Sequence, residues 1–388
     1  MAKTGINIQV KDTALGAPIN VNATTLLFVE VPEDTLDLET VTVEAGEPFD
    51  LYSLSDLEAY GLTEDNATQL YNHVRDFYNP CEGINNTGTL LWVNIGVNKL
   101  SVILKSVVDS GGFDKRPRNV LYAQTYSQAE ITAQSPPIES TIDIGGAQSE
   151  GFYTVVVAGI KGGENPQGPV SGWVDLATLK SPFVGYVVST NGIDADPCVG
   201  KVGGILAATS VGTSIGDCTL PPASDKSEIL FNQGSIDVSV LDNSRLNEVA
   251  EKQYIFLRPR APKNGLWFND GATANDASNA LSTLEASRTL CAIVDDLRAF
   301  FTTYINTRVP VTASGDIQPA YKQTVLDNAF DRVIQPYIDS GDISDARISL
   351  VAQNNDMVGT RTWEVSLSIL PAPTLRWVEG FVFYVNKL

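Results

Sequence analysis

The chain has 388 residues, of which 43% are hydrophobic and 19% charged, a composition typical of a folded protein rather than a disordered one. Its length is enough for two or three domains with a sizeable core. The formal net charge is −20, and residues 12–74 hold 13 acidic side chains with no lysine or arginine. Such a field repels phosphate, so the sequence argues against direct nucleic-acid binding.

Membrane, metal and cofactor signals are missing from the sequence. No apolar run approaches the roughly 20 residues that span a bilayer, and the first residues lack the apolar stretch of a signal peptide. None of the four cysteines forms a C-x-x-C pair, and neither a calcium loop nor a phosphate-binding or dinucleotide-binding glycine motif occurs. We therefore expect a protein made in the cytoplasm, with no membrane insertion, no metal and no cofactor.

The first 80 residues predict an arm followed by two helices. In residues 1–25, Ile6, Ile8 and Val10 alternate with polar residues and have little to pack against locally, as in a strand-like arm. A short helix over 53–61 and a longer one over 67–78 follow. The only histidine, His73, lies in the longer helix, where we expect a partly exposed position rather than a ligand.

The middle of the chain alternates strands with helical connectors, which indicates an α/β domain. Strands are expected at Leu90–Ile95, Val102–Val108, Val120–Gln124, Thr154–Ala158 and Val184–Ser189, and helical connectors at Leu176–Leu179 and Val199–Thr209.

A possible catalytic motif follows these elements. Residues 212–216, G-T-S-I-G, match the G-x-S-x-G turn that displays a serine nucleophile in many hydrolases. Such a serine needs a histidine base, which follows the serine in the fold that uses this turn. His73 instead precedes Ser214 by about 140 residues. We therefore expect no enzyme, and a serine hydrolase using Ser214 is kept only as an alternative.

The C-terminal third predicts two long helices and then three strands. The helices are expected at Ser278–Thr307 and Ala320–Ile338, and the strands at Arg347–Ala352, Thr362–Leu370 and Leu375–Val385. The last strand ends in F-V-F-Y-V, which is apolar on both faces. A strand of this kind is a hazard in a free monomer, so it needs a neighbour to cover it.

Several of these stretches resemble contractile tail sheath proteins. They are D-P-C-V-G-K-V-G-G-I-L-A-A-T-S-V-G-T-S-I-G-D, N-G-L-W-F-N-D, the helix S-R-T-L-C-A-I-V-D-D-L-R-A-F-F, and the ending R-T-W-E-V-S-L-S-I-L-P-A-P-T-L-R-W-V-E-G-F-V-F-Y-V. The resemblance covers residues 196–218 and 264–388. It implies that Ser214 belongs to a structural turn.

The resemblance implies an α/β and α+β multidomain fold. Residues 1–25 would be a strand-donating arm, 26–265 one or more α/β domains, and 266–388 a C-terminal α+β domain. In the C-terminal domain, two long helices would pack on a sheet that the terminal strands of neighbouring subunits complete. Such strand addition takes affinity from main-chain hydrogen bonds and register from alternating side chains. The side chains expected to make these contacts are Ile6, Ile8, Val10, Phe381, Phe383 and Val385.

The resemblance also implies a function. Copies of the chain would polymerise helically around an inner tail tube, together with baseplate and tail terminator proteins, in a bacteriophage virion or a contractile injection system assembled in the bacterial cytoplasm. Contraction would drive the tube through a target envelope. Arg288, Arg298 and Lys322 are expected on the exposed sides of the two long helices, as candidates for contact with the tube. A non-contractile virion structural protein is the alternative.

One basic cluster has two possible interpretations. Lys252, Arg258, Arg260 and Lys263 lie close together in the sequence. They are either ordinary surface charge or a surface that meets the acidic N-terminal region of another subunit.

Overall fold

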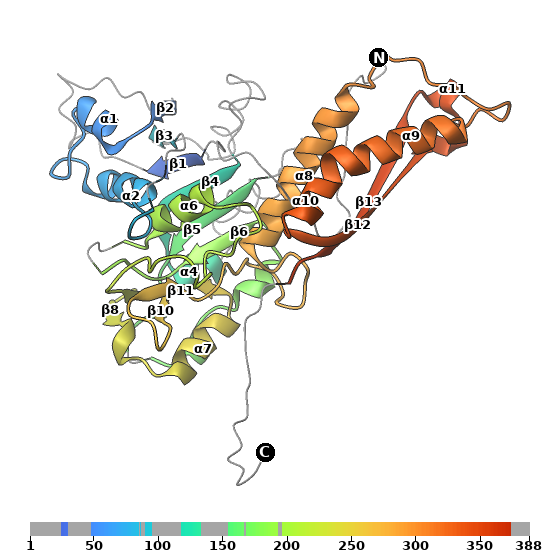
Figure 1. The fold of residues 1–388 in the computed structure, drawn as a ribbon. Helices are drawn as coiled ribbons and strands as arrows, with labels where there is room; N and C mark the ends of the chain where they lie inside the picture. Colours follow the sequence, from blue (N-terminus) through green and yellow to red (C-terminus); the bar gives the residue numbers. More distant parts are fainter. Residues whose placement is uncertain are drawn as a thin grey trace, which may run out of the picture.

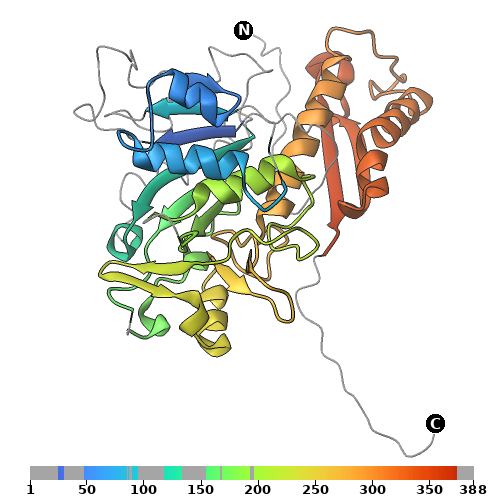
Figure 2. The same cartoon turned by 60° about the vertical axis from the view of Figure 1, so that its left-hand side comes forward.

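The computed structural model describes residues 25–29, 48–84, 86, 90–94, 118–132, 154–166, 168–192 and 196–373. The expected arm residues Ile6, Ile8 and Val10, the predicted strand over 102–108, and the terminal strand with Phe381, Phe383 and Val385 lie outside these residues. An α/β domain forms the body of the molecule. A C-terminal lobe, drawn in orange and red, extends from one side of it (Figures 1 and 2).

Within the described residues, seven strands form the central sheet in the order β2-β3-β1-β4-β5-β6-β9. Neighbouring strands are parallel, except that β2 runs antiparallel to β3. The strands are β1 Thr25–Val29, β2 Pro48–Leu51, β3 Leu90–Asn94, β4 Asn119–Tyr126, β5 Val155–Ile160, β6 Val184–Val187 and β9 Tyr254–Ile255. The strand predictions at 90–95, 120–124, 154–158 and 184–189 are confirmed. Every residue of β5 and β6 is buried, as parallel sheets covered on both faces require.

Two layers cover this sheet. On one face lie α1 (Leu54–Ala59), α2 (Thr68–Tyr78) and α6 (Val199–Ala208), whose apolar side chains share a core with Val155 and Val157 of β5. On the other face lie α4 (Gln128–Thr132), the 3₁₀ turns η4 (Val170–Gly172), η5 (Leu176–Leu179) and η6 (Val238–Val240), the hairpin of β7 (Glu228–Phe231) and β8 (Gly234–Asp237), and α7 (Asn243–Glu251). Alternate side chains of the strands therefore point into two separate hydrophobic cores, one on each face of the sheet.

The α2 and α6 helices approach each other closely because α6 carries glycines on the facing side. A Cβ atom at Gly200 would overlap the carbonyl oxygen of His73, and one at Gly204 would overlap the carbonyl oxygen of Phe77. Any larger residue would push the helices apart. His73 is only 3% exposed, so the expectation of a partly exposed histidine is wrong. The close approach of α6 buries this part of α2.

Helix α8 (Leu284–Thr302) connects the α/β domain with the C-terminal lobe (Figure 1). It is shorter than the predicted helix over 278–307. Its first turn is capped by Thr283, whose hydroxyl accepts a hydrogen bond from the backbone N–H of Ala286 (3.3 Å). Just before it, the Asp276 carboxylate accepts from the backbone N–H of Ser278 (2.8 Å). Such local side-chain bonds hold the preceding residues in turns instead of helix.

The rest of the lobe consists of a second helical segment and a strand pair. The helical segment comprises α9 (Pro319–Ala329), a π-helical turn at Phe330–Ile334 and α10 (Gln335–Asp339). The strands are β12 (Ile343–Ala352) and β13 (Trp363–Pro371), with the short helix α11 (Met357–Thr360) between them. These elements confirm the predicted second helix and the first two predicted strands. The division of the chain at residues 25 and 265 stays a prediction.

Candidate assembly surface

The β12–β13 hairpin has unpaired edges in the described structure. The two strands pair antiparallel from Ile343↔Pro371 to Ala352↔Trp363, and in the described residues no further strand pairs with either. Each strand therefore presents one edge whose backbone N–H and C=O groups have no strand partner there. Edges of this kind are templates for the addition of another strand.

The two faces of the hairpin differ in polarity. On β13, Glu364, Ser366 and Ser368 are exposed, whereas the alternate side chains of Val365, Leu367 and Ile369 are half-buried against the helices. The predicted alternation of this strand is therefore confirmed. The side chains of the apolar face are only half-buried, and Leu370, which shares the parity of the polar face, is 60% exposed.

An aromatic cluster fixes the far end of the hairpin to the helices. The ring of Trp363 lies 5.6 Å from that of Tyr304, 6.3 Å from that of Phe301 and 6.5 Å from that of Tyr321, measured between centroids. These rings come from the start of β13, the end of α8 with the turn after it, and the start of α9. Aromatic pairs at such separations add to the stability that area burial provides. The hairpin is thus presented on a rigid support.

Arg288 is buried, so its expected exposure on α8 is wrong. The side chain is 6% exposed, and its Nη2 donates to the carbonyl oxygens of Leu206 (2.5 Å) and Thr209 (3.3 Å) at the C-terminal end of α6. A cation is favourable there because the last carbonyls of a helix carry partial negative charge. Burial lowers the pKa of Arg288 to about 10, while nearby Glu285 and Asp342 oppose the shift. Arg288 therefore joins the lobe to the α/β domain.

Arg298 is also buried, and its expected exposure is wrong as well. It is 7% exposed, with Nη1 3.3 Å from the carboxylate of Asp295 one turn earlier. Arg288 lies four residues after Leu284 and three before Cys291. Arg298 lies in the same way between Val294 and Phe301, so both arginines have the spacing of the apolar stripe. This spacing was the signal for burial. Lys322 on α9 is half-buried.

The G-x-S-x-G segment forms a packed turn. Ser214 is 6% exposed, and its hydroxyl accepts a hydrogen bond from the backbone N–H of Gly216 (3.3 Å). A Cβ at Gly212 would overlap the carboxylate of Asp342, and one at Gly216 would lie 3.0 Å from the carbonyl oxygen of Phe268. The segment follows α6 through turns and has no strand before it, so it is not a nucleophile elbow. The two glycines let the segment fit between the turn that joins α10 to β12 and the end of β11 (Leu266–Phe268).

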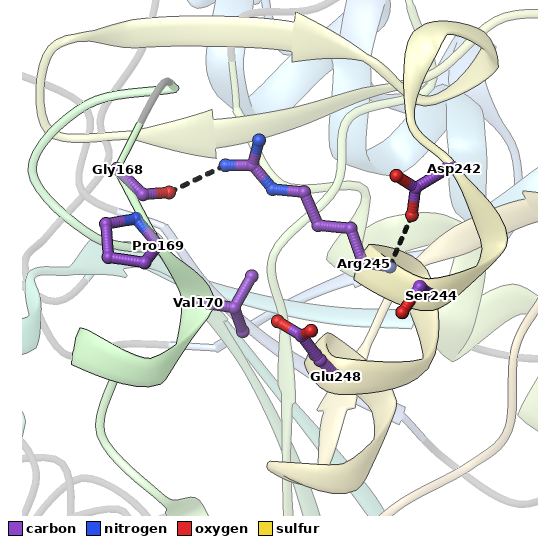
Figure 3. Close-up of a pocket in the computed structure, with 7 residues that line it drawn as sticks. All are labelled: Gly168, Pro169, Val170, Asp242, Ser244, Arg245 and Glu248. Atoms are coloured by element: carbon purple, nitrogen blue, oxygen red, sulfur yellow. Dashed lines mark hydrogen bonds between the residues drawn. The ribbon is translucent and has the colours of Figure 1, made fainter.

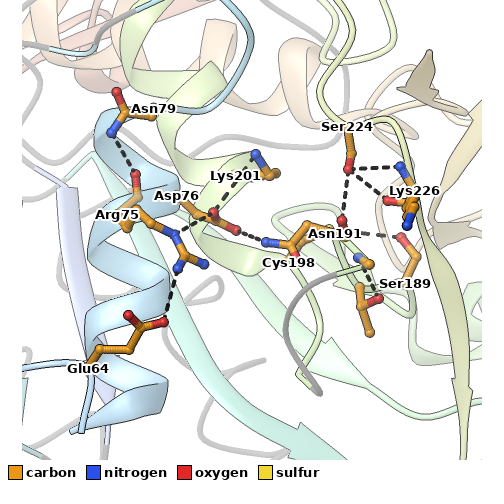
Figure 4. Close-up of polar contacts among 12 residues, drawn as sticks. Glu64, Arg75, Asp76, Asn79, Ser189, Asn191, Cys198, Lys201, Ser224 and Lys226 are labelled. Carbon is orange, nitrogen blue, oxygen red and sulfur yellow. Dashed lines mark hydrogen bonds and ion pairs between the residues drawn. The ribbon is translucent and has the colours of Figure 1, made fainter.

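A buried polar cluster ties α2 to α6 and to the end of β6 (Figure 4). The Asp76 carboxylate lies 3.8 Å from Nζ of Lys201 and accepts from Nδ2 of Asn191 (2.9 Å). Burial raises the pKa of Cys198 to about 12 and that of Cys81 to about 11. Both therefore stay protonated thiols at neutral pH, which is unsuitable for a nucleophile. The polar groups of this cluster fit a role in holding the fold.

One surface cavity of about 320 Å³ lies between the loop before η4 and the start of α7 (Figure 3). Its lining residues are Gly168, Pro169, Val170, Asp242, Ser244, Arg245 and Glu248. Nη2 of Arg245 donates to the carbonyl oxygens of Pro166 (2.7 Å) and Gly168 (2.8 Å), so its charge serves to close the loop. In the described residues, no three or more His, Cys, Asp or Glu side chains gather as a metal site, and no helix is long and apolar enough to cross a membrane.

The chain is similar in fold to several solved structures. No protein-family model and no curated protein matches the sequence. A chain of the six-fold symmetrised baseplate of the anti-feeding prophage matches with a TM-score of 0.59 and 11% identity over 100% of both chains. A chain of the contracted sheath complex of the extracellular contractile injection system PVC matches with a TM-score of 0.61 and 10% identity over 100% of this chain and 98% of that one.

A sheath tail protein from Listeria innocua matches with a TM-score of 0.54 and 12% identity, over 93% of this chain and 94% of that one. At such identities the likeness establishes the fold, which is that of contractile tail sheath proteins. The resemblance that the C-terminal sequence carries is thus confirmed at the level of the fold.

Proposed function

We propose that this chain is the structural subunit of a contractile sheath and has no catalytic activity. The fold likeness over the whole chain, including to a sheath in its contracted state, carries the proposal. Copies would assemble into a metastable helical lattice, and contraction would release interface free energy as each ring repacks. Packed interfaces are bistable rather than continuously deformable, which suits this kind of switching.

The hairpin supplies the connection between subunits in this proposal. An arm with Ile6, Ile8 and Val10 from one neighbour, and a terminal strand with Phe381, Phe383 and Val385, would add to the edges of β12 and β13. The support is that both edges lack a strand partner in the described residues and that the adjoining apolar face is only half covered. Head-to-tail contacts that do not close on themselves generate open helical filaments.

The other partners follow from the same proposal. The sheath would surround an inner tail tube and meet baseplate and tail terminator proteins, in a bacteriophage tail or an injection system assembled in the bacterial cytoplasm. Because Arg288 and Arg298 are buried, Lys322 remains as the tube-facing candidate among the three cations. We expect the tube contact to be polar and small, since it must release on contraction.

Electron microscopy of the purified full chain at high concentration tests the proposal. Hollow tubes of uniform width with helical striation are expected. Deletion of residues 1–12 or of residues 381–388 should abolish the tubes while leaving a folded subunit, as checked by circular dichroism. Unimpaired tubes from both deletions would defeat strand exchange, and a wild-type chain that never assembles, even with its tube protein, would defeat the sheath function itself.

A further inference from the structure

The hairpin of β10 (Leu257–Pro259) and β11 (Leu266–Phe268) carries an unusual charge for this chain. Between residues 252 and 269 there are four cations and no carboxylate, although the whole chain has a net charge of −20. Arg258, Arg260 and Lys263 lie on the hairpin itself, which we call the basic hairpin. Residues 261–264 at its turn are all exposed.

The cations of the basic hairpin are held in place by uncharged groups. Nη1 of Arg258 donates to the side-chain oxygen of Asn247 (3.1 Å), and Nη2 of Arg260 donates to the carbonyl oxygen of Asn269 (2.6 Å). The ammonium of Lys263 donates to the carbonyl oxygen of Cys218 and lies 5.8 Å from the ring centroid of Trp267. In the described part of the chain, no ion pair involves these three side chains. Their positions are fixed by uncharged groups, while their charges have no ionic partner among the described residues.

Like charges are therefore kept close together at this end of the molecule. Burial lowers the pKa of Arg258, and the neighbouring charge of Arg260 lowers it further. An arrangement of this kind costs free energy in an isolated subunit, and a partner with negative charge would recover it.

The opposite end of the α/β domain has the complementary character. Helix α1 and its flanking turns, residues 50–65, which we call the acidic end, contain five carboxylates and no cation. Glu58 and Asp65 are exposed there, as is Glu64, whose carboxylate lies 3.7 Å from Nη1 of Arg75. Tyr52 and Tyr60 are exposed to 62% and 39%. Tyrosine faces attract guanidinium and ammonium groups in addition to the carboxylates. The acidic end lies at the top of the α/β domain and β10–β11 near its bottom in both views (Figures 1 and 2).

We propose that the basic hairpin of one subunit docks on the acidic end of a second copy of this chain. Complementary surfaces at opposite ends of one molecule cannot satisfy each other within that molecule, but they can between successive copies. Such a contact is heterologous and repeats without closing. The inference rests on the proposed sheath function and gives it a second contact, separate from the strand edges in the C-terminal lobe.

Charge reversal tests the contact. The readout is the sedimented fraction of the full chain as NaCl is raised. Lys263→Glu is expected to lower the sedimented fraction several-fold at low salt, and Asp65→Lys to do the same. The double variant Lys263→Glu with Asp65→Lys should restore assembly, because the pair is reversed. Arg332→Glu, which alters an exposed cation of the C-terminal lobe, is the matched control and should assemble like the wild type.

The outcomes separate this inference from the sheath function. If wild type assembles and Lys263→Glu matches the Arg332→Glu control at every salt concentration, the docking is wrong while the sheath function stands. If the single variants fail and the double variant is not rescued, the basic hairpin binds another protein and the docking is again wrong. If wild type forms no polymer, the sheath function falls, and sedimentation equilibrium then decides the docking: self-association that Lys263→Glu does not weaken overturns it.

Discussion

The seven-stranded sheet and the β12–β13 hairpin differ in how far their faces are buried and their strand edges are paired. The sheet is covered on both faces and its inner strands have partners on both sides, so residues such as Val156 of β5 and Tyr186 of β6 are fully buried. In the hairpin, one face is partly covered by the helices of the lobe. Each strand has an edge that pairs with no strand in the described residues. The first region is buried between two layers of the same chain, whereas the second leaves two edges, unpaired in the described residues, for the strand addition that the proposed function requires.

The largest effect is expected at Arg288, which joins α8, the helix that leads to the lobe of the hairpin, to α6, which covers one face of the sheet. Arg288→Met would leave the carbonyl oxygens of Leu206 and Thr209 without their charged donor, and lost hydrogen bonds of a buried charged group cost about 3 kcal/mol. The free energy of unfolding from urea titration should fall by about that amount. Lys322→Met, at a half-buried position, is the control and should change it by less than about 0.5 kcal/mol. Equal values for the two variants would show that Arg288 does not join the regions.

A smaller loss of stability is expected from a change in the β12–β13 hairpin. Trp363→Ala removes three aromatic contacts from the support of the hairpin, and because the ring is only half-buried we expect a loss of about 2 kcal/mol. Hydrogen exchange should show that protection falls in β12 and β13 and is retained in β5. A uniform loss of protection across both regions would mean that the lobe does not open separately.

The stability of the α/β domain should fall when a single methyl group is added between α2 and α6. Gly204→Ala introduces a Cβ against the carbonyl oxygen of Phe77, and overpacking of this kind costs more than the gain in helix propensity, by about 1 kcal/mol net. Gly172→Ala is the matched control, since a Cβ there meets nothing within 4 Å. Thermal unfolding should separate the two variants. A stabilised Gly204→Ala variant would mean that α2 and α6 can move apart at little cost.

The smallest effect concerns Asp296 on α8, whose carboxylate accepts a hydrogen bond from the Tyr337 hydroxyl of α10. Burial raises the pKa of Asp296, although that hydrogen bond and nearby Arg118 oppose the shift. A carboxyl with a raised folded-state pKa binds its proton more tightly in the folded chain, so its contribution to stability declines as pH rises from the unfolded to the folded pKa. Asp296→Asn should lack this decline, measured as the difference from wild type in urea titrations between pH 4 and pH 8.

The regular elements could be predicted from the sequence because their patterns are local. The apolar runs at 155–160 and 184–187 and the alternation over 363–369 are read directly from the side chains. The start of α8 was placed too early because the bonds that hold residues 276–282 in turns depend on side-chain geometry. The burial of His73 could not be predicted, since it depends on glycines more than 120 residues away.

Less of the candidate assembly surface could be predicted. The strand that the sequence predicts to need a neighbour, Leu375–Val385, lies outside the described residues, so that expectation stays a prediction. The structure adds that β12 and β13 have no third strand in the described residues. The charge of Arg288 and Arg298 predicts exposed positions on α8, whereas their spacing within the apolar stripe corresponds to the buried side where the structure has them. The tertiary partner of Arg288, the end of α6, lies some 80 residues away, and a chain pattern does not reveal such a contact.

Helix α8 has a mechanical consequence. It begins in the core of the α/β domain and ends at the aromatic cluster around Trp363, about 28 Å further along at 1.5 Å per residue. Because α8 is held at both ends, a sideways force that a neighbouring subunit applied to the hairpin would reach the α/β domain as torque. The lobe would then act as a lever arm, with Arg288 near its pivot.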